Sequence, residues 1–273
     1  MINFNPPNLQ TLVELYESFS GIKYFDKDHT YEINGEKAIT SVSGLIGKYE
    51  KPFDSKKIAG NVARKEKVPV ETILERWEYG KNYSCHKGSE FHLYVENFLE
   101  RRFAPLDREA IIKFISGSAG YHKEDLEKYY QEMALLIKNF KNFYEWWKQD
   151  HILVKSEFVV GDARSKVCGT IDNLSYNKKT NEFALFDYKT NKKINRKNDY
   201  GESLLQPFDY IPKCELAKYS LQLWLYKLIF ERNSPYQIGE LGIVWVAGKD
   251  DYELITPTDY RKEAAQMLEN VCI

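Results

Sequence analysis

The sequence has few cysteines and no long apolar run, and both absences limit what the protein can be. Only four cysteines occur among the 273 residues, and no two of them form a Cys-x-x-Cys pair: Cys85, Cys168, Cys214 and Cys272. We therefore expect free, buried thiols in a reducing compartment. No stretch approaches the roughly 18 apolar residues of a transmembrane helix, and the first residues do not resemble a secretory signal. We expect a cytoplasmic protein that does not contact a membrane.

Several catalytic signatures are also missing. The chain contains no G-x-x-x-x-G-K-[ST] motif, so we expect no internal ATP motor and no ATP as cofactor. It contains neither the G-x-S-x-G motif of serine hydrolases nor the H-E-x-x-H motif of zinc proteases. Cys85 and His86 lie near His92, but no fourth ligand follows at a spacing typical of zinc sites.

The charges nearly cancel, since 39 Lys and Arg face 40 Asp and Glu for a net charge of −1. This balance excludes a uniformly basic protein that coats DNA, but it does not exclude a local basic patch. One such patch follows residue 190, where Lys192, Lys193, Arg196 and Lys197 occur without an acidic neighbour. We interpret this run as a track for phosphate groups, with an ordinary solvated loop as the alternative.

The pattern of the sequence changes near residue 151. Residues 1–150 are mostly helical in pattern, with helices expected over 54–84 (broken near Pro69), 89–101 and 123–148. Residues 151–273 contain expected strands at 152–160, 166–176, 182–189, 239–247 and 252–255, with a helix over 213–231. This order predicts an α/β (α+β) fold with a central mixed sheet flanked by helices.

Two of these strands form an expected antiparallel hairpin that carries acidic residues at one end. If the register is symmetric about the turn near Lys179, Leu174 faces Leu185 and Asp172 faces Asp187. Two opposed carboxylates repel each other and need a cation or a shared proton. Their hard oxygen atoms suit Mg²⁺ or Mn²⁺. Lys189 shares the face of Asp187 and could neutralise charge that develops on a phosphate. The alternative is a surface hairpin with solvated charges.

Five short motifs occur in an order that resembles a known nuclease family. GTID at 169–172 and FDYKT at 186–190 resemble the paired motifs of the PD-(D/E)xK nuclease superfamily, in its RecB-like exonuclease branch. The segment 88–92 resembles the GxxxH motif of that branch, and Glu157 resembles the acidic residue of the preceding strand. Gln222 and Tyr226 match a QxxxY motif. Segments near residues 41–54 and 206–223 are similar to phage-type and mitochondrial-genome-maintenance-type members.

The resemblance implies a role for each matching residue. It implies that His92, Asp172, Asp187 and the backbone carbonyl of Tyr188 bind the metal, and that Lys189 is catalytic. It further implies Mg²⁺ or Mn²⁺ as cofactor. The iron–sulfur members of the branch carry a cysteine cluster near the C-terminus that this sequence lacks. We therefore expect no iron–sulfur cluster.

Three further residues have less specific implied roles. Glu157 either supports the catalytic centre or pairs with a basic side chain. Gln222 and Tyr226 lie four residues apart, on one face of a helix, and either line the layer behind the metal ligands or contact the DNA backbone.

Taken together, the resemblance implies a single nuclease domain over residues 1–273 with a restriction-endonuclease-like core. The expected activity is metal-dependent exonuclease cleavage of single-stranded DNA or DNA ends, in recombination, repair or replication. A helical half that narrows access to the metal favours an exonuclease. A structure-specific endonuclease and a non-catalytic module that binds DNA ends remain alternatives. DNA is the expected partner, protein partners stay open, and the expected location is the cytoplasm of a bacterial or phage-infected cell.

Overall fold

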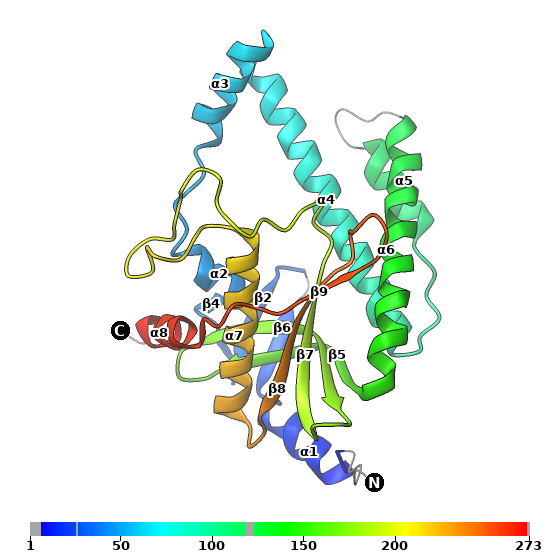
Figure 1. Ribbon diagram of the computed structural model, residues 1–273, viewed down its shortest axis with the longest axis vertical. Helices are drawn as coiled ribbons and strands as arrows, with labels where there is room; N and C mark the ends of the chain where they lie inside the picture. Colours follow the sequence, from blue (N-terminus) through cyan, green and yellow to red (C-terminus); the bar gives the residue numbers. More distant parts are fainter. Residues whose placement is uncertain (1–6, 26, 118–122, 272–273) are drawn as a thin grey trace.

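A helix-flanked mixed sheet forms the body of the protein, and the computed structural model describes residues 7–25, 27–117 and 123–271 (Figure 1). None of the helices in these ranges is long and apolar enough to cross a membrane. The helices are α1 (Leu9–Ser18), α2 (Val42–Gly47), α3 (Ser55–Glu66), α4 (Val70–Leu99), α5 (Arg108–Gly117), α6 (Lys123–Asp150), α7 (Glu215–Asn233) and α8 (Arg261–Val271). The strands are β1 (Ile22–Phe25), β2 (Thr30–Ile33), β3 (Glu36–Lys37), β4 (Thr40–Ser41), β5 (His151–Asp162), β6 (Val167–Asn177), β7 (Glu182–Lys189), β8 (Ile238–Trp245) and β9 (Glu253–Ile255).

The main sheet has the order β4-β6-β7-β8-β9, with β5 also paired to β6. Strands β5 and β7 each pair with β6 in the antiparallel direction. Strand β7 also pairs with β8 in the parallel direction, and α7 connects these two strands along the chain. A parallel pair needs such a crossover connection. The expected mixed sheet flanked by helices is therefore confirmed. The change from helices to sheet falls between α6 and β5, as the sequence pattern indicates.

The register of the β6–β7 hairpin is the one that the sequence predicts. Tyr176 pairs with Phe183 and Leu174 with Leu185, and the ladder ends at the pair formed by Asn173 and Phe186. The acidic pair of the prediction lies one step beyond this last pair. The two acidic residues of the hairpin therefore lie where β6 and β7 separate.

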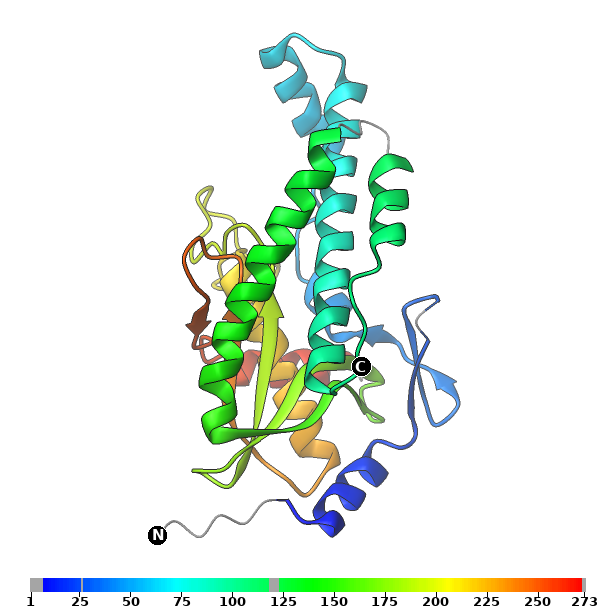
Figure 2. The ribbon, with the colours of Figure 1, turned by 90° about the vertical axis from the view of Figure 1, so that its right-hand side faces the viewer.

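Alternate side chains of β7 enter two different hydrophobic cores. Phe183 and Leu185 face the core that includes α1, α2, α7 and α8. Phe186 and Tyr188 face the core that includes α4, α5 and α6. Figures 1 and 2 show α7 on one side of the sheet and the long helices α4 and α6 on the other. This period-two alternation is the reason that the continuous apolar run from Phe183 to Phe186 is stable in one strand, because a core covers each face of the sheet.

Helix α4 differs from the prediction. The break near Pro69 is confirmed, because α3 ends at Glu66 and α4 begins at Val70. The expectation of a separate helix from residue 89 is wrong, because α4 continues through Gly88 to Leu99. Its buried side chains, among them Phe91, pack against α6 and outweigh the helix-breaking tendency of glycine. Helix α5 was not predicted.

Helix α3 and the start of α4 project beyond the ends of α5 and α6 (Figure 2). These two helices have a small core of their own, formed by Ala59, Ala63 and Ile73. Cys85, Cys168 and Cys214 are free, as expected, but the expectation that they are buried is confirmed only for Cys168, since Cys85 is exposed and Cys214 is half-buried. The prediction for Cys272 lies outside the described residues.

We expect Phe140→Ala to lower the free energy of unfolding by about 3–5 kcal/mol, because it removes a ring buried between α4, α6 and the sheet. The Phe140 ring is fully buried and lies 5.5 Å from the Phe98 ring and 5.7 Å from the Tyr188 ring. Phe103→Ala is the matched control, since Phe103 is 97% exposed. Urea unfolding of both variants measures the difference. Equal effects of the two substitutions would contradict the assigned packing.

Candidate metal centre

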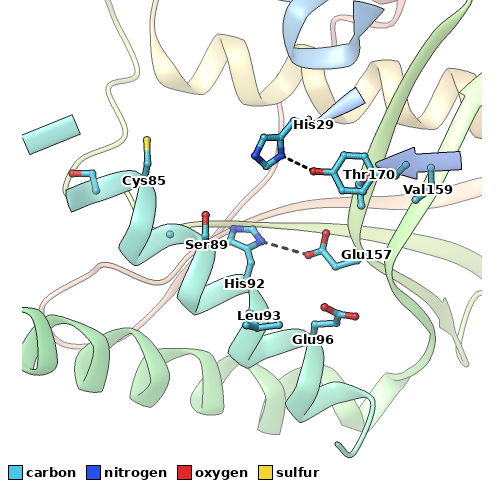
Figure 3. A pocket seen from close by; sticks show the side chains of 12 residues that line it. His29, Cys85, Ser89, His92, Leu93, Glu96, Glu157, Val159 and Thr170 are labelled. Atoms are coloured by element: carbon cyan, nitrogen blue, oxygen red, sulfur yellow. Dashed lines mark hydrogen bonds and ion pairs between the residues drawn. The ribbon is translucent and has the colours of Figure 1, made fainter. Parts of the chain in front are cut away.

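Side chains from three different elements converge beside the open end of the hairpin. His92 of α4, Glu157 of β5 and Asp172 of β6 each offer one ligand atom, and these atoms all lie within 4.8 Å of one another. The Nδ1 atom of His92 is 3.6 Å from Oδ2 of Asp172 and 3.7 Å from Oε1 of Glu157. Figure 3 shows His92 and Glu157 facing each other. The group could hold one metal ion.

Glu157 reaches this group through an unusual backbone conformation. It has a φ of 50° inside strand β5, in the left-handed region that residues other than glycine seldom adopt. The pairs Ser156–Asn173 and Phe158–Ile171 on either side place Glu157 across from Asp172. Both the conformation and the opposed charges cost free energy. Such a cost inside a strand is typical of a residue held in place for function.

The second carboxylate of the hairpin, Asp187, is more deeply buried. Its side chain is 1% exposed, and Oδ2 lies 2.6 Å from Nζ of Lys189. Among the described residues, neither of its oxygen atoms accepts a hydrogen bond of good geometry. Asp172, by contrast, accepts a hydrogen bond of 2.8 Å from the backbone N–H of Tyr188. A buried carboxylate with such incomplete partners is well suited to receive a cation.

Lys189 is held from three sides. Besides Asp187, its Nζ donates to Oε1 of Gln222 at 3.3 Å and lies 4.4 Å from the centre of the Tyr219 ring. The ring face attracts the ammonium group by a cation–π interaction. These contacts fix the ammonium group close to Asp187.

The charges of the site are unbalanced. Three carboxylates, those of Glu157, Asp172 and Asp187, lie around two cations, His92 and Lys189. Burial raises the pKa of Asp187 to about 6, although Lys189 opposes this effect. Burial also raises the pKa of Asp172. Burial disfavours protonation of His92, but the carboxylates of Asp172 and Glu157 outweigh it and raise the pKa of His92 to about 9.

This donor set fits a divalent cation. The site combines one imidazole nitrogen with carboxylate oxygens. Metal binding requires a neutral imidazole, so three ionised carboxylates then face only Lys189 and the site lacks two positive charges. Mg²⁺ and Mn²⁺ prefer oxygen ligands, and Mn²⁺ also accepts imidazole. His92, Glu157 and Asp172 could bind such an ion directly, with Asp187 next to them.

The structure places the predicted residues of the metal centre in two neighbouring groups. His92, Asp172 and Glu157 form the compact group described above, whereas Asp187 lies outside it and pairs with Lys189. Whether the Tyr188 carbonyl binds a metal stays a prediction. The side chain of Tyr188 points away into the helical core, where its hydroxyl accepts a hydrogen bond of 2.8 Å from Asn173.

Gln222 and Tyr226 lie on one face of α7, as their spacing predicts. Tyr226 is buried, its hydroxyl accepts a hydrogen bond of 3.2 Å from Gln222, and its ring fills the space beside Gly169. This burial favours a supporting role behind Lys189 over contact with DNA. Tyr219 was not among the predicted site residues. Its position three residues before Gln222 could have identified it, because that spacing puts both on the same helix face.

The predicted basic track lies in the loop that follows β7. Lys192, Lys193, Arg196 and Lys197 are all exposed, and Arg196 forms an ion pair with Glu253 at the edge of the sheet. Their binding to DNA stays a prediction.

Comparisons with known proteins add little to this geometry. No family model matches the chain, and no curated protein matches it either. Among solved structures, the chain is similar to a "putative exonuclease" from Eubacterium rectale, with 18% sequence identity and a TM-score of 0.40. The match covers 73% of this chain and 68% of that chain. A likeness this low carries no functional argument, so the function must be inferred from the site itself.

We expect Glu157→Gly to raise the free energy of unfolding by about 1 kcal/mol, because glycine adopts the positive φ without strain and removes one of the opposed charges. Val159→Gly on the same strand is the control. It has no positive φ to relieve and loses a half-buried side chain, so it should lower the free energy of unfolding. Thermal and urea unfolding of both variants check this. A loss of stability in both would show that Glu157 is not strained.

Proposed function

We propose that this chain is a deoxyribonuclease that depends on Mg²⁺ or Mn²⁺ and acts as an exonuclease on single-stranded DNA or DNA ends. The observation that carries the proposal is the convergence of His92, Glu157 and Asp172 beside the buried pair of Asp187 and Lys189. The motif order, which resembles the RecB-like branch of the PD-(D/E)xK nucleases, supports it and favours a role in recombination, repair or replication within a single nuclease domain.

Each residue of the centre has a distinct task in this proposal. His92, Glu157 and Asp172 hold the cation, and Asp187 completes its surroundings. A bound divalent cation supplies a more acidic water and polarises phosphate oxygens. Lys189 places a fixed positive charge where negative charge develops on the phosphate, and its three contacts keep it there before substrate arrives.

The surroundings of the site support DNA with a free end as the substrate. The basic residues after β7 provide phosphate contacts next to Lys189. Helix α4 covers the end of β7, since a Cβ atom at Gly88 would lie 3.5 Å from Oγ1 of Thr190. A covered approach of this kind suits a single strand that enters by its end better than a continuous duplex.

We expect Lys189→Ala and Asp187→Ala each to reduce DNA cleavage by at least about 100-fold, because each removes an essential part of the electrostatic stabilisation. Lys179→Ala in the β6–β7 turn is the control and should keep full activity. End-labelled linear single-stranded and double-stranded DNA, incubated with Mg²⁺ or Mn²⁺, measures the rates. Circular dichroism shows whether the variants fold. Undiminished cleavage by either site variant would contradict the assignment.

A covalently closed circular DNA distinguishes the proposed exonuclease from the alternatives. An exonuclease leaves the circle intact and degrades the linear form of the same DNA. Cutting of the circle would identify an endonuclease. Binding of DNA without degradation in either metal would identify a non-catalytic module.

We expect the affinity for Mn²⁺ to increase as the pH rises from about 6 to about 9. These limits are the raised pKa values of two groups, about 6 for Asp187 and about 9 for His92. Protons compete with the metal for these groups, so lowering the pH through either pKa weakens binding. Calorimetric titration with Mn²⁺ at several pH values measures the trend. In His92→Ala the affinity should be lower and its increase above pH 7 smaller. A wild-type affinity that does not change with pH would contradict His92 as a ligand.

A further inference from the structure

A cavity of about 650 Å³ opens directly beside the candidate metal centre. His92 and Glu157 belong both to the metal group and to the wall of this cavity, so a molecule bound in it would also lie next to the metal. The volume falls within the range of roughly 300–1,000 Å³ that is usual for small-molecule sites. The proposed cleavage does not by itself explain a space of this size on this side of the metal.

The β1–β2 hairpin contributes Tyr24 and His29 to the wall opposite α4, beside residues of β5 and β6, and its aromatic rings are held in place. The hydroxyl of Tyr24 lies 2.7 Å from Nδ1 of His29, an interaction marked by the dashed line at His29 in Figure 3. The Tyr24 ring also lies against the Tyr31 ring, with 4.9 Å between centroids. Tyr31 in turn contacts Thr170 of β6, with 3.0 Å between the two hydroxyl oxygens. The hairpin is therefore attached to the strand that carries Asp172.

The α4 wall of the cavity has small side chains on two successive helical turns. Ser84, Cys85, Gly88 and Ser89 line it one helical turn apart, before His92. Figure 3 shows Cys85 and Ser89 on α4, with His29 and Thr170 across the cavity from them. Small residues at this spacing leave room for a flat ring between the helix and the hairpin.

The charges of the wall indicate which part of a nucleotide fits. The carboxylates of Glu96 and Glu157 line the cavity, and no lysine or arginine is found among its described lining residues. The cationic group that the site contributes to this wall, His92, is already paired with Glu157 and Asp172. A phosphate group would be repelled there, and the basic residues lie instead in the loop after Lys189. A neutral aromatic ring with polar edges suits the Tyr24 ring and the hydroxyl groups of Ser89 and Thr170.

We propose that this cavity binds the nucleobase next to the cleaved phosphodiester bond, stacked on Tyr24. The inference rests on the proposed nuclease function and adds where the base of the terminal nucleotide lies. Stacking on an aromatic side chain tolerates any base, so the site holds the nucleotide without selecting a sequence.

The test compares two small ligands in calorimetric titrations of the full chain with Mn²⁺ present. One probe is 2′-deoxyadenosine 5′-monophosphate, and the other is 2-deoxyribose 5-phosphate, which lacks the base. We expect the nucleotide to bind about fivefold to 150-fold more tightly, the ratio that corresponds to roughly 1–3 kcal/mol of base stacking. Equal affinities, or no binding of either probe, would overturn the inference.

Two variants and one control locate the binding. Tyr24→Leu should remove most of the preference for the nucleotide and leave the affinity for the sugar phosphate unchanged. Ser89→Phe, which fills the cavity from the α4 side, should do the same. Phe25→Leu is the control, because the exposed Phe25 is the neighbouring aromatic residue of β1 and does not line the cavity. Identical behaviour of Tyr24→Leu and Phe25→Leu would overturn the inference.

The same measurements separate this inference from the nuclease proposal. Base-dependent binding by a protein that hydrolyses no DNA would contradict the nuclease and support the nucleobase site. Hydrolysis of DNA without base-dependent binding would contradict the nucleobase site alone.

Discussion

The repulsion between buried carboxylates at the open end of one hairpin is the constraint on which the rest of the site depends. Asp187 is almost fully enclosed, and Asp172 lies on the neighbouring strand close to Glu157. Burial alone would favour their neutral forms. The fold offsets this with two cationic groups, His92 from the distant helix α4 and Lys189, which follows Asp187 by two residues on β7. The contacts of Lys189 with α7 follow from the same requirement, since a buried ammonium group also needs partners.

The sequence predicts the sheet and the hairpin well because both depend on local patterns. Alternating side chains and a short polar turn are sufficient to set the register, and Leu174 and Leu185 pair as the pattern indicates. Helix α4 could not be predicted in the same way, because the packing of Phe91 against α6 keeps the helix continuous through Gly88. That contact joins residues far apart in the sequence and leaves no local signal.

Within the candidate site, the sequence predicts the residue types and their spacing along the chain. It does not predict how deeply the side chains are buried or which backbone conformation they adopt. The spacing of Gln222 and Tyr226 places them on one face of a helix, yet it does not reveal that α7 is enclosed on nearly all sides. The positive φ of Glu157 has no sequence signature, because glutamate rarely adopts it and no glycine marks the position. The sequence alone therefore does not predict that His92, Glu157 and Asp172 form one compact group. It predicts Asp187 as a member of the metal centre, whereas the structure places Asp187 beside that group.

The length of α4 has a mechanical consequence. Val70, where the helix begins in the projecting arm, and His92 in the centre are 22 positions apart, or about 33 Å along a rigid rod. The contacts of α4 with α6 run from Tyr79 to Phe98, so they lie on both sides of His92. A force applied at α3 would therefore reach the metal centre only by moving α4 along α6, and this extended contact shields the position of His92 from events at the far end of the helix.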